Sequence, residues 1–413
     1  MKTAGIIAEY NPFHEGHRYH IEETRRLTGV DFIVVVMSGD FVQRGEPAIV
    51  DKYLRAQMAL ESGADLIIEM PSLYASSSAE YFATAGVGIL ESLGCVNYLS
   101  FGSEEAGVEE LTTLADLMLE EPDLYKETLK KELESGKNYP QAREEAVLAC
   151  LPRERYRQIL RQPNHILALE YVKAIRRRKS SIEPVAVLRK GSGYLEEEWD
   201  ISQDIYPSAT ALRLCLREGK DRELLEKGSP LCSDLLWECM EKNETVDWED
   251  LMPYLDYKVL MDSRILGKYF GMDYDIFRRI TKLYQPGKKF EDIISLCHSR
   301  NYTDAALRRI LLHVVLNMED YPFMSKAAEI PIPYARILGL RKEAGKLLSY
   351  IREQGSIQVI QKTVEGRSID KYDHSARLLF EHDIRCGDFY EQIAAKKAGR
   401  EARNEWQRNP VIL

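Results

Sequence analysis

Apolar runs of strand length alternate with helical stretches over the first hundred residues, and this alternation limits the possible folds most. The runs are Thr3 to Glu9, Phe32 to Met37, Leu66 to Met70 and Val96 to Phe101. The segments 16–27, 50–62 and 79–93 between them have helical periodicity and the length of crossover connections. The pattern predicts an α/β fold whose parallel sheet carries helices on both faces.

The rest of the chain is mostly helical in pattern. Residues 105–180 are charge-rich and helical with a break at 136–140, and a strand over 182–188 is expected to complete the sheet, so that 105–180 packs as an insert. From about 221 to 350 the pattern is almost wholly helical, and the last sixty residues contain one strand-like run, 356–363. We expect one domain over 1–220 and a mainly helical domain over 221–413.

The first strand runs into the loop Asn11-Pro12-Phe13-His14-Glu15-Gly16-His17, which opens a helix. A helix amino end offers unpaired N–H groups and a partial positive charge, so it collects phosphates. His14 and His17 share a helix face and can each donate a hydrogen bond to a phosphate oxygen, while Gly16 permits close approach of a ligand. The loop therefore predicts a nucleotide triphosphate site in which the two histidines stabilise the transition state.

Two other interpretations of the histidine pair remain open. His residues at helical spacing bind zinc, but the zinc-protease pattern has its histidines four apart with Glu beside the first, whereas these are three apart with a glycine between. We expect no metal site here. A purely structural role for the pair is the other alternative.

Four more clusters follow predicted strands or open helices. Gly102 would let a base or ribose lie against the backbone, although a plain strand-to-helix turn is an equal alternative. Asn164 either caps its helix or reaches the nucleotide with its amide. The cations Arg189 and Lys190 would neutralise a triphosphate, and the hydroxyls of Ser208 and Thr210 open another helix, with Arg213 one turn on.

The loop after the second strand offers a site for a second substrate. It runs from 38 to 47 and carries a carboxylate, an amide and a guanidinium, with a lysine a little further along the chain. These side chains are Asp40, Gln43, Arg44 and Lys52.

Charge and cysteine usage bound the partners and the compartment. The net charge of -10 argues against indiscriminate nucleic-acid binding, but basic stretches at 176–179, 278–289, 308–309, 341–342 and 396–408 remain candidates for phosphate contacts. Seven cysteines without a C-x-x-C pair, and no targeting or membrane-spanning segment, predict a reduced cytoplasmic protein that does not enter a membrane. The oligomeric state is left open.

The histidine loop resembles the H-x-G-H signature of the adenylyl-transferring superfamily, which has a Rossmann-like nucleotidyltransferase fold. Residues 208–213 resemble its second signature, I-S-S-T-x-I-R, but depart from it at Ala209 and Leu212. The stretches 5–20, 37–70, 101–104, 163–171 and 189–194 are similar to the bacterial tRNA(Met) cytidine acetate ligases, and 304–318 and 333–340 more loosely so.

That resemblance implies a specific activity. Family members use ATP and acetate to form acetyl-adenylate, then acetylate N4 of the wobble cytidine of elongator tRNA(Met). It implies an ATP site and a helical second half that binds tRNA. We also expect Mg²⁺ to accompany the triphosphate, because this ion is held with few protein ligands. The implied ATP-site residues are Ile7, Ala8, Glu9, Tyr10, Asn11, Pro12, Phe13, His14, Glu15, Gly16, His17, Arg18, Tyr19, His20, Gly102, Asn164 and Arg189. The interpretation from the residues alone stops at adenylyl transfer.

An adenylyltransferase acting on a small phosphorylated cofactor precursor remains the alternative, although such an enzyme rarely needs so large a second half. A non-catalytic RNA-binding protein on the same scaffold is a third interpretation, and the retained histidines argue against it. The run at 323–327 looks somewhat like the synthetase K-M-S-K-S loop, and we interpret it as a coincidence because it lies far from any predicted strand.

Overall fold

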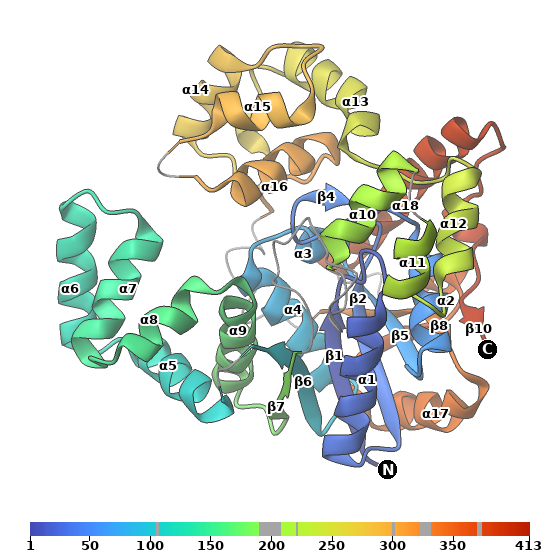
Figure 1. Ribbon diagram of the computed structural model, residues 1–413, viewed down its shortest axis with the longest axis horizontal. Coiled ribbons are helices and arrows are strands. Elements are labelled where there is room, and N and C mark those ends of the chain that lie inside the picture. The colour runs from blue at the N-terminus through green and yellow to red at the C-terminus, as the bar shows by residue number, and fades with distance from the viewer. Residues whose placement is uncertain (105–106, 190–207, 220–221, 300–301, 322–331, 370–373) are drawn as a thin grey trace.

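A central sheet organises the molecule (Figure 1). The computed structural model describes residues 1–104, 107–189, 208–219, 222–299, 302–321, 332–369 and 374–413. The sheet has eight strands in the order β10-β8-β5-β2-β1-β6-β7, with β9 also paired to β8. All pairs are parallel except the antiparallel pair β5–β8. The strands are β1 Thr3–Ala8, β2 Phe32–Ser38, β5 Leu66–Met70, β6 Tyr98–Ser103, β7 Glu183–Leu188, β8 Tyr334–Leu340, β9 Gln358–Ile360 and β10 Val411–Ile412.

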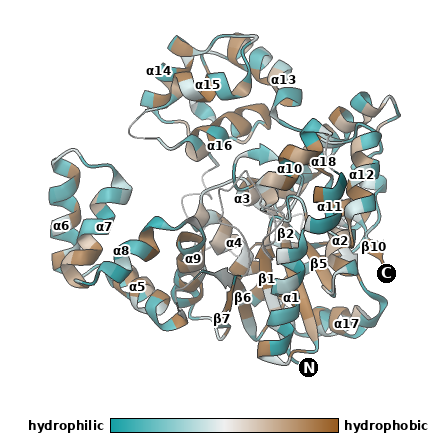
Figure 2. Cartoon of the chain, in the orientation of Figure 1, coloured by the Kyte–Doolittle hydropathy of each residue, from teal (hydrophilic) through white to brown (hydrophobic). Residues whose placement is uncertain are grey.

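Alternating strand residues build a core on each face of the sheet. Ile6 and Val35 pack in the core that includes α1 and α2, whereas Ile7, Val34 and Val36 pack in the core that includes α4. The expected α/β sheet with helices on both faces is confirmed. Hydropathy follows the same division, with apolar strands inside and helices apolar on one side (Figure 2). The helices that follow or flank the strands are α1 Glu15–Thr28, α2 Lys52–Glu61, α3 Ser72–Ala75, α4 Ala79–Ser92, α10 Ala209–Glu218, α11 Arg222–Gly228, α12 Ser233–Glu241, α17 Gly345–Gln354 and α18 His374–Ala398.

The helical excursion between β6 and β7 is present as expected. It consists of α5 Val108–Glu120, α6 Asp123–Glu134, α7 Tyr139–Cys150, α8 Glu154–Arg161 and α9 Pro163–Arg178. The predicted break lies between α6 and α7, where Gly136 has φ 87° and Asn138 caps α7 by accepting from the Gln141 N–H at 3.0 Å. The chain then returns to the sheet as β7, parallel to β6.

A second helical group stands at the top of Figure 1. We call it the α13–α16 unit, formed by α13 Trp248–Met261, α14 Tyr274–Leu283, α15 Phe290–Cys297 and α16 Asp304–Val315. Beside it lies a small hairpin of β3 Phe41–Val42 and β4 Glu46–Pro47. Short 3₁₀ helices occur at Leu266–Lys268 (η1), Lys342–Ala344 (η3), Thr363–Ser368 (η4) and Glu405–Gln407 (η5).

The sheet does not end at β7, which corrects the sequence-based expectation. Tyr334–Leu340, inside the stretch 221–350 that was expected to be almost wholly helical, is the strand β8, and β9 and β10 flank it. Every residue of β8 is buried, including Arg336. A short buried run with a cation in its middle has neither the alternation of a half-buried strand nor a long apolar stretch, so periodicity misses it.

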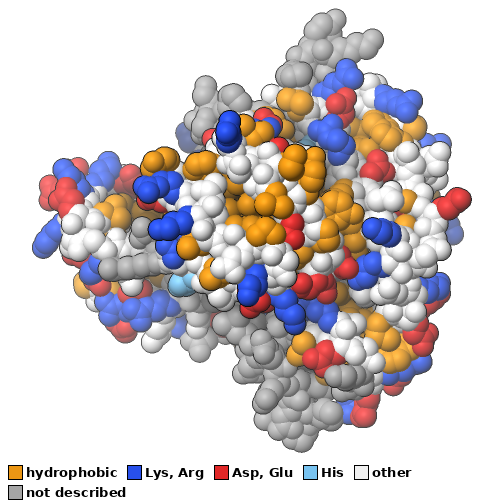
Figure 3. All heavy atoms as spheres, turned by 90° about the horizontal axis from the view of Figure 1, so that it is seen from above, with side chains coloured by type: hydrophobic (Ala, Val, Ile, Leu, Met, Phe, Trp, Pro, Cys, Tyr) orange, Lys and Arg blue, Asp and Glu red, His pale blue; other side chains and the backbone are white. Residues whose placement is uncertain are grey.

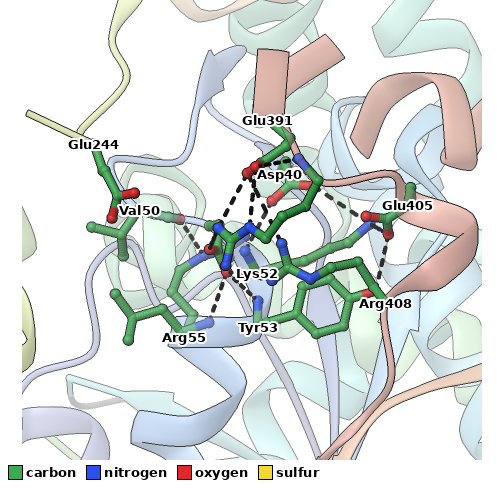
Figure 4. Close-up of polar contacts among 12 residues, drawn as sticks. Asp40, Val50, Lys52, Tyr53, Arg55, Glu244, Glu391, Glu405 and Arg408 are labelled. Atoms are coloured by element: carbon green, nitrogen blue, oxygen red, sulfur yellow. Dashed lines mark hydrogen bonds and ion pairs between the residues drawn. The ribbon is translucent and has the colours of Figure 1, made fainter. Parts of the chain in front are cut away.

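A buried ion cluster attaches the carboxyl-terminal segment to the sheet, and Figure 4 shows three of its members, Asp40, Lys52 and Glu405. Lys52 of α2 lies 2.7 Å from both Glu69 and Glu405, and Arg336 lies 3.0 Å and 2.6 Å from the same two carboxylates. Burial by itself raises the pKa of Glu405, but Lys52 and Arg336 outweigh it and lower that pKa to about 2. The four charged groups are almost completely buried, so their mutual pairing is what makes their burial tolerable.

Within the described residues, no helix is both long and apolar enough to cross a membrane. All seven cysteines are free thiols.

Candidate nucleotide-binding site

A cavity opens at the carboxyl ends of β1, β6 and β7, facing the amino ends of α1 and α10. This is the edge of a parallel sheet where ligands are expected. It is lined by Ile6, Ile7, Ala8, Glu9, Tyr10, Asn11, His14, Gly16, His17, Tyr19, His20, Gln43, Arg44, Phe82, Phe101, Gly102, Asn164, Leu167, Ala168, Tyr171, Val187, Arg189, Ser208, Ala209 and Arg213.

Most of the residues predicted for the nucleotide lie in this lining. Pro12, Phe13, Glu15, Arg18 and Thr210 do not. Glu15 and Arg18 form an ion pair with each other on α1, and the Phe13 carbonyl accepts from Ser229 Oγ at 2.9 Å. Lys190 and the run at 323–327 lie outside the described residues.

The side chains of His14 and His17 together cap the amino end of α1. His14 is the N-cap, and its Nδ1 accepts the Gly16 N–H at 3.0 Å, while Nδ1 of His17 accepts the His14 N–H at 3.2 Å. The rings are stacked with centroids 3.7 Å apart. A Cβ on Gly16 would lie 2.8 Å from Cε1 of His14, so only glycine leaves room for this ring. The imidazoles thus take the positions that Ser and Glu hold in a capping box.

Burial and nearby charges set the protonation of both rings, and the capping hydrogen bonds set their tautomers. Burial, reinforced by Arg189 and Arg213, lowers the pKa of His14 to about 3, and burial with His14 and Arg189 holds the pKa of His17 well below its usual value. Both imidazoles are therefore neutral at pH 7. Because Nδ1 accepts in each ring, the single proton is on Nε2. Among the described residues neither Nε2 has a hydrogen-bond partner, so each ring retains one N–H donor for a ligand in the cavity.

His20 also lines the cavity in a defined tautomer. Thr24 Oγ1 donates to the His20 carbonyl at 2.7 Å and therefore accepts from Ser100 at 2.6 Å. Ser100 Oγ in turn accepts from Nε2 of His20 at 2.9 Å. Burial, with Arg189, lowers the pKa of His20 to about 4, so this ring too is neutral at pH 7.

No group of three or more His, Cys, Asp or Glu side chains in the described part of the chain is arranged to hold a metal ion.

The cavity is polar on the side of the β3–β4 hairpin. Glu9 is the one carboxylate in the described lining, and its Oε1 accepts the Gln43 N–H at 2.8 Å. Burial raises the pKa of Glu9, and the nearby Arg44 opposes this rise. Arg213 donates to the Asn11 carbonyl at 2.7 Å and lies 3.4 Å from Glu46. Arg44 donates to Thr210 Oγ1 at 3.4 Å, so this side gathers two guanidiniums, Arg44 and Arg213, with the carboxylates of Glu9 and Glu46.

The loop after β1 is held by side chains that face the protein. The Asn11 side chain accepts the Ile49 N–H at 2.8 Å and donates to Glu46 at 3.3 Å. Arg55 of α2, fully buried, donates to the carbonyls of Glu9, Ser38, Gly39 and Val50. One guanidinium therefore ties the carboxyl ends of β1 and β2 together, a role that no sequence motif indicated.

The side toward β6, β7 and α9 is apolar. Phe101, Leu167, Tyr171 and Val187 line it, and the rings of Phe101 and Tyr171 lie 6.2 Å apart. A Cβ on Gly102 would lie 3.3 Å from Cγ of Arg189, so these two predicted residues are in contact.

Several of the predicted side chains are engaged within the protein. Asn164 is not a cap, because Gln162 is the N-cap of α9. The Asn164 side-chain amide donates to Glu104 at 2.7 Å. The helix start expected at Ser208 is confirmed, and Ser208 is the N-cap of α10, where its side chain accepts the Ala211 N–H at 3.1 Å.

The loop predicted for a second substrate is divided by the structure. Gln43 and Arg44 line the cavity, but Asp40 and Lys52 are buried, and Lys52 Nζ lies 3.4 Å from Asp40 within the ion cluster. That prediction is wrong for these two residues. The cavity residues that sequence reasoning missed are Ile6, Phe82, Leu167, Ala168, Tyr171 and Val187. They look like ordinary core residues: Ile6 and Val187 lie in strands of the sheet, and the packing of α4 and α9 against the sheet brings the other four to the site.

Comparison with known proteins agrees with this architecture. A family model described as HIGH Nucleotidyl Transferase matches residues 1–405. The tRNA(Met) cytidine acetate ligase of Thermoanaerobacter sp. (strain X514) is 38% identical over 392 residues, covering 94% of this chain and 95% of that protein. The enzyme of the same name from Acetivibrio thermocellus is 36% identical over 422 residues, covering all of both chains.

Two solved structures share the fold over the full length of both chains. Apo Thermotoga maritima TmcAL superposes with a TM-score of 0.93 at 28% identity. The same protein bound with alpha-thio ATP superposes with a TM-score of 0.90 at 27% identity. The resemblance inferred from the histidine loop and its companion motifs is thereby confirmed: this chain belongs to the HIGH nucleotidyl transferase family and, within it, to the tRNA(Met) cytidine acetate ligases.

Proposed function

We propose that the protein is an ATP-dependent ligase that activates acetate as acetyl-adenylate and transfers the acetyl group to N4 of the wobble cytidine of elongator tRNA(Met). The names of the relatives and the nucleotide analogue bound to Thermotoga maritima TmcAL support this proposal. The observation that carries it is the neutral histidine pair, which presents two Nε2–H donors at the amino end of α1.

The two sides of the cavity suit different ligands. Aromatic and aliphatic side chains near Gly102 and Tyr171 suit a nucleobase, and the amino end of α1 suits phosphates. The hairpin side, with Gln43, Arg44 and Arg213, suits the small carboxylic acid. In this arrangement the α-phosphate lies at the carboxyl end of β1, between the nucleobase and the carboxylic acid.

Adenylate formation then needs electrostatic stabilisation and no base. A carboxylate oxygen of acetate attacks the α-phosphorus, the bond to the bridging oxygen breaks, and pyrophosphate leaves. Acetate is already ionised at neutral pH. Negative charge grows on the α-phosphate oxygens, where His14 and His17 donate from Nε2 and the start of α1 adds its partial positive charge. A neutral imidazole suits this task, because its Nε2–H donates a hydrogen bond and the ring gives up no proton to the solvent.

Acetyl transfer needs a proton acceptor. N4 of the cytidine attacks the acetyl carbonyl, the bond to the phosphate oxygen breaks, AMP leaves, and the amine gives up one proton. Glu9, whose pKa is raised, is the described carboxylate in the cavity and the group we assign to receive it. Mg²⁺ would accompany the triphosphate as its charge partner, and a lining with one described carboxylate fits an ion held mainly by phosphates and water.

Ion pairing narrows the choice of tRNA-binding surface. Arg176, Arg177 and Arg178 are paired with Asp116, Glu80 and Glu91, and the tail arginines at 400, 403 and 408 gather around Glu391. Arg308 is paired with Glu291. These cations are already neutralised and offer less to a phosphate.

The stretch 278–289 differs. Arg278, Lys282, Lys288 and Lys289 are exposed, and no ion pair joins them to a described residue. Arg278 also lies over the ring of Tyr274, which is 70% exposed. Cations beside an exposed aromatic ring are typical of RNA-binding surfaces, so we assign tRNA contacts to α14 and the segment leading into α15. Lys and Arg side chains lie scattered among hydrophobic ones on the face seen from above in Figure 3, without forming one continuous stripe.

Exchange of labelled pyrophosphate into ATP tests the first half-reaction. We expect exchange that requires acetate, and no exchange with propionate or glycine at the same concentration. Acetylated cytidine in bulk tRNA, found by nuclease digestion and mass spectrometry, tests the second half. No exchange with any acid, together with turnover of a phosphorylated cofactor precursor, would instead identify an adenylyltransferase.

A further inference from the structure

The β3–β4 hairpin joins the α13–α16 unit to the cavity. Each of its strands has two residues, and a two-stranded hairpin of this size is not stable by itself. Its conformation therefore depends on what holds it. Its tip, residues 43–45, carries Gln43 and Arg44 into the cavity.

The base and the tip of the hairpin are held by different parts of the molecule. At the base, Glu46 contacts Asn11 and Arg213, and Phe41 packs against Tyr390 with ring centroids 6.1 Å apart. On the cavity side of the tip, the Gln43 N–H donates to Glu9 and Arg44 donates to Thr210. Two further donors reach the tip from the α13–α16 unit. Trp248 Nε1 donates to the Gly45 carbonyl at 2.8 Å, and Arg309 donates to the Gln43 carbonyl at 3.4 Å.

The contact between the hairpin tip and α16 is close. Gly45 has φ 77°, and a Cβ there would lie 2.4 Å from the backbone nitrogen of Arg309, so the hairpin lies directly on the backbone of α16. Trp248 is buried and stacks on Phe290 with ring centroids 3.7 Å apart, which fixes the direction of its N–H. On its other side, the Gln43 peptide donates to Glu9.

We propose that Trp248 and Arg309 are positioning residues for the reaction: from the α13–α16 unit they hold the hairpin tip, and through it they set Gln43, Arg44 and the Glu9 carboxylate on the acid-binding side of the cavity. The kinetic part of this inference rests on the proposed function. The structural part, that the tip depends on these two donors, does not.

Trp248→Phe tests the inference, because it removes the N–H and keeps an aromatic ring for Phe290. Trp237→Phe is the matched control, since Trp237 donates the same N–H at 2.8 Å to Glu241 on the surface of α12. In acetate-dependent pyrophosphate exchange we expect the KM for acetate to rise about 3- to 10-fold for Trp248→Phe, the effect of one hydrogen bond, with the KM for ATP changed less than about 2-fold. The control should match wild type.

Hydrogen exchange of the peptide covering 41–47 gives a readout that needs no activity. We expect faster exchange there in Trp248→Phe and unchanged exchange in Trp237→Phe. Unchanged exchange at 41–47, or equal rises in both KM values, would overturn the inference even if wild type forms the adenylate. If wild type shows no pyrophosphate exchange with any acid, the proposed function fails. The hydrogen-exchange result still decides the structural part.

A second pair of variants covers the case in which Trp248→Phe does not fold. Arg309→Lys shortens the donor to Gln43, and Arg308→Lys changes the neighbouring residue, whose partner is Glu291 instead. We expect faster exchange at 41–47 and a raised KM for acetate only in the first. Identical behaviour of the two would contradict the inference.

Discussion

In the histidine loop, the two nitrogen atoms of each imidazole ring have separate tasks. In both His14 and His17, Nδ1 serves the backbone and Nε2–H is left for the ligand. A substitution that keeps the first and removes the second therefore separates folding from catalysis.

Asparagine is that substitution, because its Oδ1 lies near the position of Nδ1. We expect His17→Asn to keep the melting temperature within about 3 °C and to lower kcat for pyrophosphate exchange about 100- to 1000-fold, the usual effect of losing one transition-state donor. Steady-state exchange and thermal unfolding measure the two effects. His298→Asn, an exposed histidine paired with Asp304, is the control. Normal exchange by His17→Asn would exclude the phosphate role.

The lowered pKa of His14 has a consequence for stability against pH. Its folded value of about 3 lies below the unfolded value of about 6.5, so the unfolded chain takes up the proton first as the pH falls. The ring thus makes the fold less stable below pH 6.5, by up to about 1.4 kcal/mol per pH unit.

We therefore expect the free energy of unfolding of His14→Asn to fall less steeply than that of wild type between pH 6.5 and 5. Urea denaturation at several pH values measures it. Nitrogen NMR should find both rings neutral and protonated on Nε2 at pH 7. Parallel stability curves for the two proteins would show that His14 titrates normally.

At the scale of elements, the hairpin tip is the point where two helical regions and the sheet meet. Gly45 and Gly287 offer a matched comparison, since both have φ 77° but only Gly45 has atoms close to the position of a Cβ. Gly287→Ala should cost about 1 to 2 kcal/mol for its left-handed backbone alone.

Gly45→Ala should cost more than Gly287→Ala, about 2 to 5 kcal/mol in total, because an overpacked contact adds about 1 to 3 kcal/mol to the same backbone cost. Chemical denaturation gives both values. Equal costs would mean that α16 moves away from the hairpin without loss, and the contact would then not be tight.

At the scale of the whole molecule, the carboxyl-terminal segment is part of the sheet's core. Glu405 pairs with Lys52 and Arg336 in the buried cluster, so Glu405→Gln leaves two buried cations short of one charge. We expect a loss of about 3 to 5 kcal/mol in the free energy of unfolding. Glu401→Gln, an exposed neighbour, should change it by less than about 0.5 kcal/mol. A small effect of Glu405→Gln would mean that the cluster rearranges around one carboxylate.

The proposed tRNA surface is tested by two double variants that remove the same charge. Lys288→Gln with Lys289→Gln should weaken tRNA binding and lower the slope of log Kd against log salt by about 2, one for each lost phosphate contact. Arg176→Gln with Arg177→Gln removes cations already paired with Asp116 and Glu80, so it should leave the slope unchanged. Filter binding at several salt concentrations measures both. Equal slopes for the two would place the tRNA elsewhere.

The sequence by itself determined the strands β1, β2, β5, β6 and β7, the crossover helices, and the helix that begins at the histidine loop, while the phosphate role of that loop stays a prediction. These depend on contacts between residues near in the chain, namely strand periodicity and helix capping, and such contacts leave a spacing that can be read. The tertiary structure alone decided that Lys52 and Asp40 are buried, that Arg336 sits in a strand, and that Trp248 reaches Gly45. These pairings join residues far apart in the chain, and a lone charged or aromatic residue looks the same in sequence whether its partner is water or a distant segment.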